Sequence, residues 1–129
     1  DGSIRLLAMD AEIFGPSLVY EERYRNLGFW ASAEDYAAWT MEVPTAGRYA
    51  VTLDYACAPE AAGNRFMLVC GDEILSGEVR ATSSWDQYDW QGAGLIELPA
   101  GRTRIMFRSE GPVQQYLLDL HQIVLEKAQ

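Results

Sequence analysis

Apolar and polar residues alternate along several short stretches of this chain, and turn residues separate the stretches every 8 to 12 positions or so. The apolar phase of the clearest stretch consists of Tyr49, Val51, Leu53, Tyr55 and Cys57. The segments 39–43 and 103–107 repeat the pattern, with Thr40, Glu42 and Arg104 among the residues of the other phase. A period of two places successive side chains on opposite faces of a strand. The sequence therefore predicts an all-β fold.

Further strands are expected at 4–13, 65–70, 73–79, 85–90, 94–98 and 116–125, which makes about nine in all. In the last of these the apolar phase changes near His121, which predicts a β-bulge there. Only the segment 17–26 has a helical spacing, because Tyr20 and Tyr24 are four residues apart. One or two helical turns are therefore expected in that segment.

Two corners of the chain have the same composition. Val43-Pro-Thr-Ala-Gly47 and Leu98-Pro-Ala-Gly101 each place a strand end, a proline and a glycine immediately before a new strand. Proline cannot extend the interior of a strand, and glycine adopts the positive φ of a tight turn. Two such corners indicate two sheets joined by short connections. We therefore predict an antiparallel β-sandwich of the jelly-roll type.

Length and charge limit the functions that are open to the chain. Its 129 residues (14.4 kDa) are expected to form a single domain, 1–129, excised from a larger protein. Ten basic and 19 acidic residues give a net charge of −9, which argues against nucleic acids and anionic polymers as partners. Neutral glycans, or a cation held by acidic residues, remain compatible with this charge. No apolar run approaches the length of a membrane span.

Residues for catalysis are scarce. His121 is the only histidine, no Gly-x-Ser-x-Gly motif occurs, and no glycine-rich phosphate loop occurs. Cys57 and Cys70 are expected to be buried free thiols, because a hairpin around the loop near Ala61 would hold their Cα atoms too far apart to bridge. We therefore predict that the chain is not an enzyme. A pair of carboxylates suited to glycoside hydrolysis stays open as an alternative, because 19 acidic residues include close pairs.

The aromatic residues divide into two groups. Those on inward phases of strands are expected in the core, namely Trp39, Tyr49, Tyr55, Phe66 and Phe107. Those at loops or strand ends are Phe29, Trp30, Trp85, Tyr88, Trp90 and Tyr116. Aromatic faces offer a large apolar area with polar tips, which suits ligands such as sugars. The alternative is that these loop rings plug the open ends of the sandwich.

Acidic residues offer a second candidate site. Glu12 ends the first expected strand and Asp119 lies in the last. If the two strands are neighbours, their carboxylates converge and could ligate Ca²⁺ together with backbone carbonyl oxygens. The alternative is that these carboxylates pair with Arg5 or Lys127.

In the order and spacing of its motifs the chain resembles family 6 and family 35 carbohydrate-binding modules, whose fold is a galactose-binding-like sandwich. The matching stretches are Ala11-Glu12, Leu27-Gly28-Phe29, Asp35-Tyr-Ala-Ala-Trp39, Pro44-Thr-Ala-Gly47-Arg-Tyr49-Ala-Val51, Tyr55-Ala56, Thr82-Ser-Ser-Trp85, Leu98-Pro-Ala-Gly101 and Leu118-Asp119-Leu120. The resemblance implies a jelly-roll sandwich without catalysis. It also implies a secreted, extracellular or periplasmic protein in which flanking catalytic or adhesive domains accompany the module.

The resemblance also implies a site. Phe29 or its neighbour Trp30 would stack on a sugar together with Trp85, and Glu12 and Asp119 would be among the ligands of a structural calcium ion. Gln115 stands near the place of the family's usual asparagine, beside Tyr116, and Phe29 replaces the usual tyrosine. We therefore predict glycan binding by Phe29, Trp30, Trp85, Tyr88, Gln115 and Tyr116. The alternative function is that of a structural or adhesive interdomain module that binds no sugar.

Overall fold

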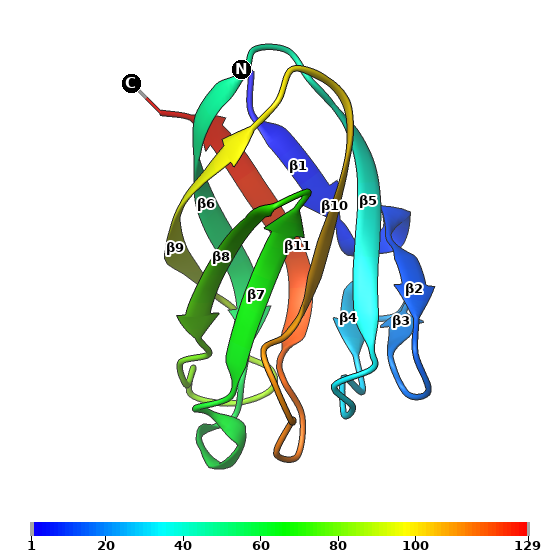
Figure 1. Cartoon of the computed structure of the whole chain (residues 1–129). Coiled ribbons are helices and arrows are strands. Elements are labelled where there is room, and N and C mark those ends of the chain that lie inside the picture. The colour runs from blue at the N-terminus through cyan, green and yellow to red at the C-terminus, as the bar shows by residue number, and fades with distance from the viewer. Residues whose placement is uncertain (1, 129) are drawn as a thin grey trace.

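The computed structural model describes residues 2–128, which form two antiparallel β-sheets packed face to face (Figure 1). The six-stranded sheet has the order β3 (Val19–Glu21), β4 (Asn26–Gly28), β11 (Asp119–Lys127), β6 (Gly47–Ala56) and β9 (Asp89–Leu98), and β1 (Ile4–Leu7) also pairs with β11. The five-stranded sheet has the order β2 (Glu12–Phe14), β5 (Tyr36–Val43), β10 (Gly101–Ser109), β7 (Arg65–Cys70) and β8 (Glu73–Glu78). The predicted all-β sandwich is confirmed, with eleven strands instead of about nine.

The core lies between the two sheets and follows the predicted phases. Tyr49, Val51, Leu53 and Tyr55 of β6 are buried and share the core with the inward residues of the opposite sheet, which include Trp39, Met41, Ile105 and Phe107. Burying a side chain of this size stabilises the fold by about 1.5–3 kcal/mol. The alternation of apolar and polar residues in the sequence therefore predicts correctly which face of these strands is buried.

The two proline–glycine corners connect one sheet to the other. The first leads from β5 to β6 and the second from β9 to β10. Gly47 has a φ of 146° and Gly101 has a φ of 99°, and residues other than glycine rarely adopt such values. The prediction that these corners join two sheets is confirmed.

Long-range pairing changes three local expectations. The segment expected as one strand at 4–13 is divided by the 3₁₀ turn η1 (Ala8–Asp10), so that β1 joins one sheet and β2 the other. The segments 85–90 and 94–98 give a single strand, β9. Cys57 directly follows β6 and Cys70 ends β7, and these two strands belong to different sheets and are separated by the turn η2 (Pro59–Ala61), so they form no hairpin. Both thiols are nevertheless free and buried, as predicted.

The expected helical turns at 17–26 are wrong, because this segment forms the β3–β4 hairpin. The amides of Tyr24 and Arg25 both donate to the carbonyl of Glu21, and Arg25 has a φ of 57°. The bulge near His121 is confirmed by a shift of register between Leu120 and Gln122 against β6. Within residues 2–128 there is no helix with the length and apolarity required to cross a bilayer.

Candidate functional site

Loops at the end of the sandwich away from the two termini (Figure 1), together with strands β3, β4 and β11, line a pocket of about 560 Å³. Five of its lining residues are aromatic, namely Tyr24, Phe29, Trp85, Tyr88 and Tyr116. The other five are Glu21, Asn26, Asp86, Asp119 and His121. This volume lies within the range of small-molecule sites. The pocket brings together four of the six residues predicted to bind a glycan.

Three rings form an open wall around Tyr116. The ring of Tyr116 meets that of Phe29 edge-on, with 6.1 Å between centroids, and that of Trp85 edge-on at 6.2 Å. Phe29 is 52% exposed and Tyr116 is 39% exposed, while Trp85 is half-buried against the core. Rings that stay exposed in a concave site offer apolar faces to a ligand.

Phe29 and Trp30 point in opposite directions although they are adjacent in sequence. Phe29 has a φ of 57°, which turns the chain at the end of β4. Trp30 is completely buried, packs edge-on against Phe107 and donates its Nε1–H to the carbonyl of Asp35 at 3.2 Å. Trp30 is therefore unavailable for stacking on a ligand, which corrects its place among the predicted site residues. For this ring the alternative reading, a plug at the end of the sandwich, is the one that the structure supports.

Asp35 holds the loop that carries both rings, and sequence reasoning missed it. Its buried carboxylate accepts hydrogen bonds from the hydroxyl of Ser17 and from the backbone amides of Ser17, Leu18, Ala31 and Ser32. Burial alone would raise the pKa of Asp35, but these hydrogen bonds outweigh it and lower the pKa. Its only signal in the sequence is its place in the stretch that resembles the carbohydrate-binding modules.

Asn64 holds the loop that carries Tyr116. Its Nδ2 donates to the carbonyls of Gln114 at 2.9 Å and Tyr116 at 3.1 Å, and its Oδ1 accepts from the amide of Gln114 at 2.9 Å. Gln115, in contrast, lies at the exposed tip of this loop and donates to the carbonyl of Glu60 at 3.2 Å. Gln115 does not line the pocket, so the structure does not bring it together with the predicted rings.

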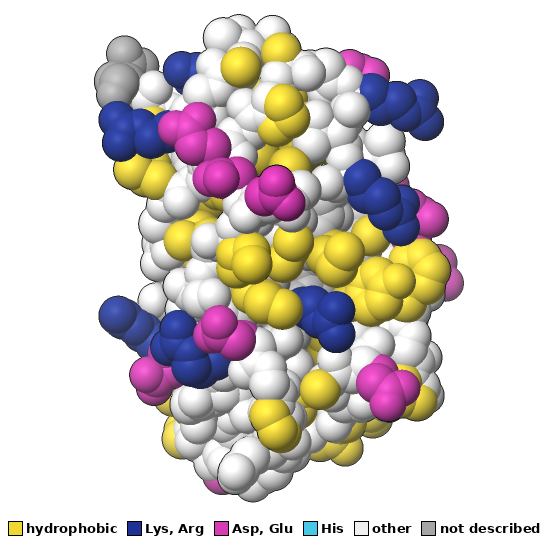
Figure 2. Space-filling view, in the orientation of Figure 1, with side chains coloured by type: hydrophobic (Ala, Val, Ile, Leu, Met, Phe, Trp, Pro, Cys, Tyr) yellow, Lys and Arg dark blue, Asp and Glu magenta, His cyan; other side chains and the backbone are white. Residues whose placement is uncertain are grey.

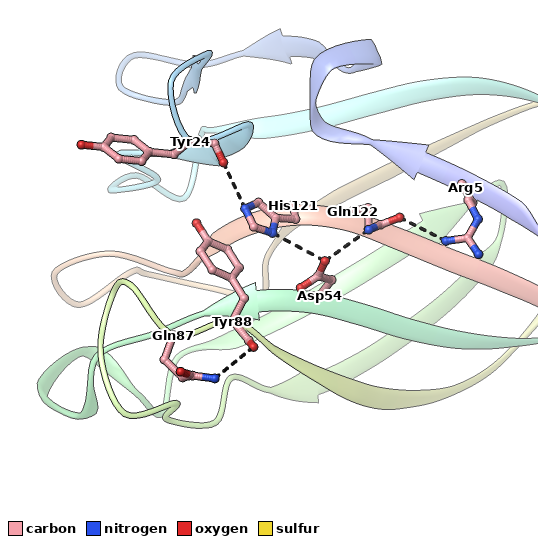
Figure 3. Close-up of polar contacts among 7 residues, drawn as sticks. All are labelled: Arg5, Tyr24, Asp54, Gln87, Tyr88, His121 and Gln122. Atoms are coloured by element: carbon pink, nitrogen blue, oxygen red, sulfur yellow. Dashed lines mark hydrogen bonds and ion pairs between the residues drawn. The ribbon is translucent and has the colours of Figure 1, made fainter.

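Tyr88 and His121 also line the pocket and lie side by side (Figure 3). Their rings stack with 3.6 Å between centroids and an angle of 4°. His121 Nε2 lies 3.0 Å from the carbonyl oxygen of Tyr24, and Nδ1 lies 3.5 Å from Asp54 Oδ2. Asp54 also accepts from Gln122. The bulge in β11 therefore places the single histidine where it orients Tyr88 beside the β3–β4 turn.

The floor of the pocket is acidic. A Cβ atom on Gly28 would overlap Glu21 Oε1 and would lie 3.0 Å from Asn26 Nδ2 and 3.1 Å from Asp119 Oδ1, so the glycine leaves room for all three side chains. Burial, and then the negative charge of Glu21, raises the pKa of Asp119 to about 7. None of the described residues that line the pocket is Lys or Arg.

The same surroundings shift the pKa of the Tyr88 hydroxyl. Burial raises the pKa of Tyr88 well above its ordinary value, and the surrounding carboxylates, first Asp119 and then Glu21, raise it further. Tyr88 therefore keeps its proton throughout the physiological range and can donate a hydrogen bond into the pocket.

Glu12 and Asp119 lie on different sheets, because β1 and not β2 pairs with β11. Glu12 forms an ion pair with Arg104, instead of the alternatives Arg5 and Lys127. Within the described part of the chain, no three His, Cys, Asp or Glu side chains are grouped to hold a metal ion. The residues therefore do not fit a calcium ion shared by Glu12 and Asp119.

The comparisons place this fold among known structures. No protein-family model and no curated protein sequence matches the chain. A family 35 carbohydrate-binding module from Clostridium thermocellum matches with a TM-score of 0.76 and 17% identity over 98% of each chain. A family 6 module from Cellvibrio mixtus lichenase 5A, solved in complex with cellotriose, matches with a TM-score of 0.73 and 15% identity over 98% of each chain.

One further match is a multidomain enzyme. In a GH26-CBM35 β-(1,4)-mannanase from Podospora anserina, the match covers 100% of this chain but 28% of that one, with a TM-score of 0.72 and 18% identity. The predicted resemblance is thus confirmed at the level of structure. This chain has the β-sandwich fold of the family 6 and family 35 carbohydrate-binding modules.

Proposed function

We propose that the chain is a non-catalytic carbohydrate-binding module and that its aromatic pocket binds the sugar. The observation that carries this proposal is the wall of three rings, Phe29, Trp85 and Tyr116, left exposed or half-buried in one concave site. The shared fold with carbohydrate-binding modules supports it. A fold alone does not determine a function, so the proposal depends on the site.

The pocket matches the two surfaces of a pyranose. The C–H faces of the sugar would lie against Phe29 or Trp85, as aromatic rings favour flat apolar groups. Sugar hydroxyl groups would donate to Glu21 and Asp119 and accept from the hydroxyl of Tyr88. The acidic floor and the net charge of −9 would repel uronic acids and sulfated sugars. The proposed ligand is therefore a glycan without negative charge, and neutral glycans are the first class to test.

Two finer points belong to the same proposal. Glu21 and Asp119 form a carboxylate pair in the pocket, so hydrolysis has to be tested directly; we expect no release of reducing sugar from any glycan that binds. We also propose that the module belongs to a secreted multidomain protein, where it would hold a neighbouring domain on a polysaccharide. The mannanase match, in which the module accompanies a glycoside hydrolase domain, supports this arrangement.

Isothermal titration against plant, algal and host glycans tests the proposal, with Trp85→Ala and Phe29→Ala as site variants. Loss of a stacking ring is expected to weaken binding roughly 10- to 100-fold. Trp90→Ala is the matched control, because Trp90 is 54% exposed but does not line the pocket. A domain that binds no glycan, or site variants that bind as well as the wild type, would contradict the proposal.

A second function, that of an interdomain module, has one observation in its favour. Figure 2 shows hydrophobic side chains across the middle of the outer face of the five-stranded sheet. Ile74 is 61% exposed there, and Met67, Val69 and Met106 are half-buried on the same face. If a domain adjoins this chain in a parent protein, Ile74→Asp should weaken its docking, measured by small-angle scattering of that protein, and leave glycan binding unchanged. Unchanged scattering would count against this second function.

A further inference from the structure

The proposed sugar pocket has an unbalanced set of polar groups. Glu21, Asp86 and Asp119 contribute three carboxyl groups, and no described lining residue is Lys or Arg. His121, the one lining residue that can carry a positive charge, faces Asp54 and the carbonyl of Tyr24 with its two ring nitrogens. The carboxylates of the pocket therefore have no cation of their own. Such a site attracts a ligand that brings a positive charge.

An unsatisfied acceptor lies in the same floor. Asn26 is 1% exposed, and its Nδ2 donates to Glu21 Oε1 at 3.0 Å, which sets the orientation of the amide. Its Oδ1 is then buried without a hydrogen-bond partner among the described residues. Buried polar atoms are almost always paired, so an orphaned acceptor that lines a pocket points to a donor from outside. A ligand donor would offset the cost of this unpaired oxygen.

Aromatic rings surround this acidic floor. Phe29, Trp85 and Tyr116 form one cluster of rings in the lining, and Tyr88 and His121 form a stacked pair. The faces of aromatic rings attract cations, and the attraction increases in a desolvated site. An ammonium group has three N–H donors and no acceptor, which suits the acceptors of Glu21, Asp119 and Asn26. A hydroxyl group has one donor and would leave part of this set unpaired.

Resting on the proposed function, we propose that the pocket selects a cationic amino sugar, a glycan unit with a free protonated amine, over neutral sugars. The amine donates to the acceptors of the pocket floor, namely Glu21, Asp119 and the orphaned Asn26 Oδ1. The sugar ring lies against Phe29 or Trp85. This inference narrows the proposed ligand, a glycan without negative charge, to a cationic one, and it departs from the expectation of a neutral glycan because it assigns the ligand class from the charge of the pocket itself.

Three ligands with one backbone test the inference. Hexamers of β-1,4-linked glucose, glucosamine and N-acetylglucosamine differ only in the C2 substituent, which is a hydroxyl, an ammonium or an acetamide group. Isothermal titration at about pH 6, where a sugar amine is protonated, should show the glucosamine hexamer binding at least about tenfold more tightly than the other two. Asp119, whose pKa is about 7 in the free protein, is expected to release its proton at this pH as the ammonium binds. The preference should shrink as salt rises from about 50 mM to about 500 mM.

Glu21→Gln removes one charge from the floor and keeps the shape of the side chain. We expect the preference of the pocket for the glucosamine hexamer over the glucose hexamer to fall severalfold, because the amide keeps an acceptor oxygen but loses the negative charge. Glu126→Gln is the matched control, because Glu126 is exposed on β11 outside the pocket. Circular dichroism checks that each variant is folded, and the comparison of the three hexamers on the wild type needs no variant.

The outcomes separate this inference from the proposed function. If the glucose hexamer binds as tightly as the glucosamine hexamer, or if only the acetylated hexamer binds, the inference is overturned and the carbohydrate-binding proposal stands. If these hexamers and a wider set of glycans all fail to bind, both are overturned. A tighter glucosamine complex that is insensitive to Glu21→Gln and to salt would also overturn the assigned role of the acidic floor.

Discussion

Asp119→Asn is expected to stabilise the free protein, and only at high pH. The carboxyl of Asp119 has a pKa of about 7 in the fold, against an ordinary value of 3.8, because burial and the charge of Glu21 disfavour its ionised form. The folded state therefore binds more protons than the unfolded state between about pH 4 and pH 7. The contribution of Asp119 to stability is fully present below the lower of these pKa values. It is lost as the pH rises through the higher one.

The size of the effect follows from the same two values. The rise in the pKa of Asp119 corresponds to a loss of at most about 4 kcal/mol in the free energy of unfolding at high pH, since one pKa unit equals 1.36 kcal/mol. The carboxyl is partly exposed, so solvent screening reduces this to roughly 1–2 kcal/mol. Asparagine has the same shape as aspartate and no charge, so the variant avoids the free-energy cost of burying an ionised carboxylate at pH 8. For a domain of this size the variant should then melt roughly 3–8 °C higher than the wild type at pH 8, and near the wild type at pH 4.

Thermal denaturation followed by circular dichroism between about pH 4 and pH 8 measures the difference. Glu126→Gln, on the same strand but exposed, is the control and should melt like the wild type throughout. If the difference in melting temperature between Asp119→Asn and wild type does not change with pH, the pKa of Asp119 is the same in the folded and the unfolded state. The description of the pocket floor as a buried, acidic site would then be refuted.

Three further predictions concern the frame of the site. Trp30→Ala should lower the free energy of unfolding by about 3–5 kcal/mol, as expected for a buried ring. Trp85→Ala should lower it less but lose glycan binding. Equal losses of stability in urea denaturation would contradict this assignment. Asp35→Ala should cost at least about 3 kcal/mol, because it leaves the donors of Ser17, Leu18, Ala31 and Ser32 without their acceptor; a melting temperature like that of the wild type would disprove its role. Glu12 is paired with Arg104 on the five-stranded sheet, and Asp119 lies on the six-stranded sheet. The melting temperature should therefore be the same with calcium and with a chelator, and a rise of several degrees with calcium would contradict this prediction.

The parts of the fold that follow local rules were predictable from the sequence. The period of two identified the buried face of β6 and of β10, because side chains of a strand alternate between core and solvent. Gly47 and Gly101 marked the corners that join the sheets, because few other residues tolerate their positive φ. The phase change near His121 identified the bulge in β11. Each of these signals is contained in a few neighbouring residues.

The aromatic site was predictable only in part. Phe29, Trp85, Tyr88 and Tyr116 were identified as loop rings with too little local reason to be core, and they do meet in one pocket. Whether Phe29 or Trp30 faces the pocket depended on the backbone at the end of β4, where the alternation of strand side chains no longer applies. The φ of 57° at Phe29 and the hydrogen bond from Trp30 to Asp35 decide it. Neither is visible in the order of residues.

The acidic floor is a product of tertiary structure alone. Glu21 and Asn26 come together because 17–26 folds as a hairpin instead of a helix, and Asp119 joins them because β4 pairs with β11. The spacing of Tyr20 and Tyr24 favours a helix only weakly, and the pairing of β4 with a core strand outweighs it. Glu12 was assigned a wrong neighbour for the same reason, since η1 moves β2 to the other sheet. The sequence by itself determined which faces are buried, because burial is set residue by residue through hydrophobicity. Which charges meet was decided by contacts between segments far apart in the chain, whose register depends on the whole sandwich.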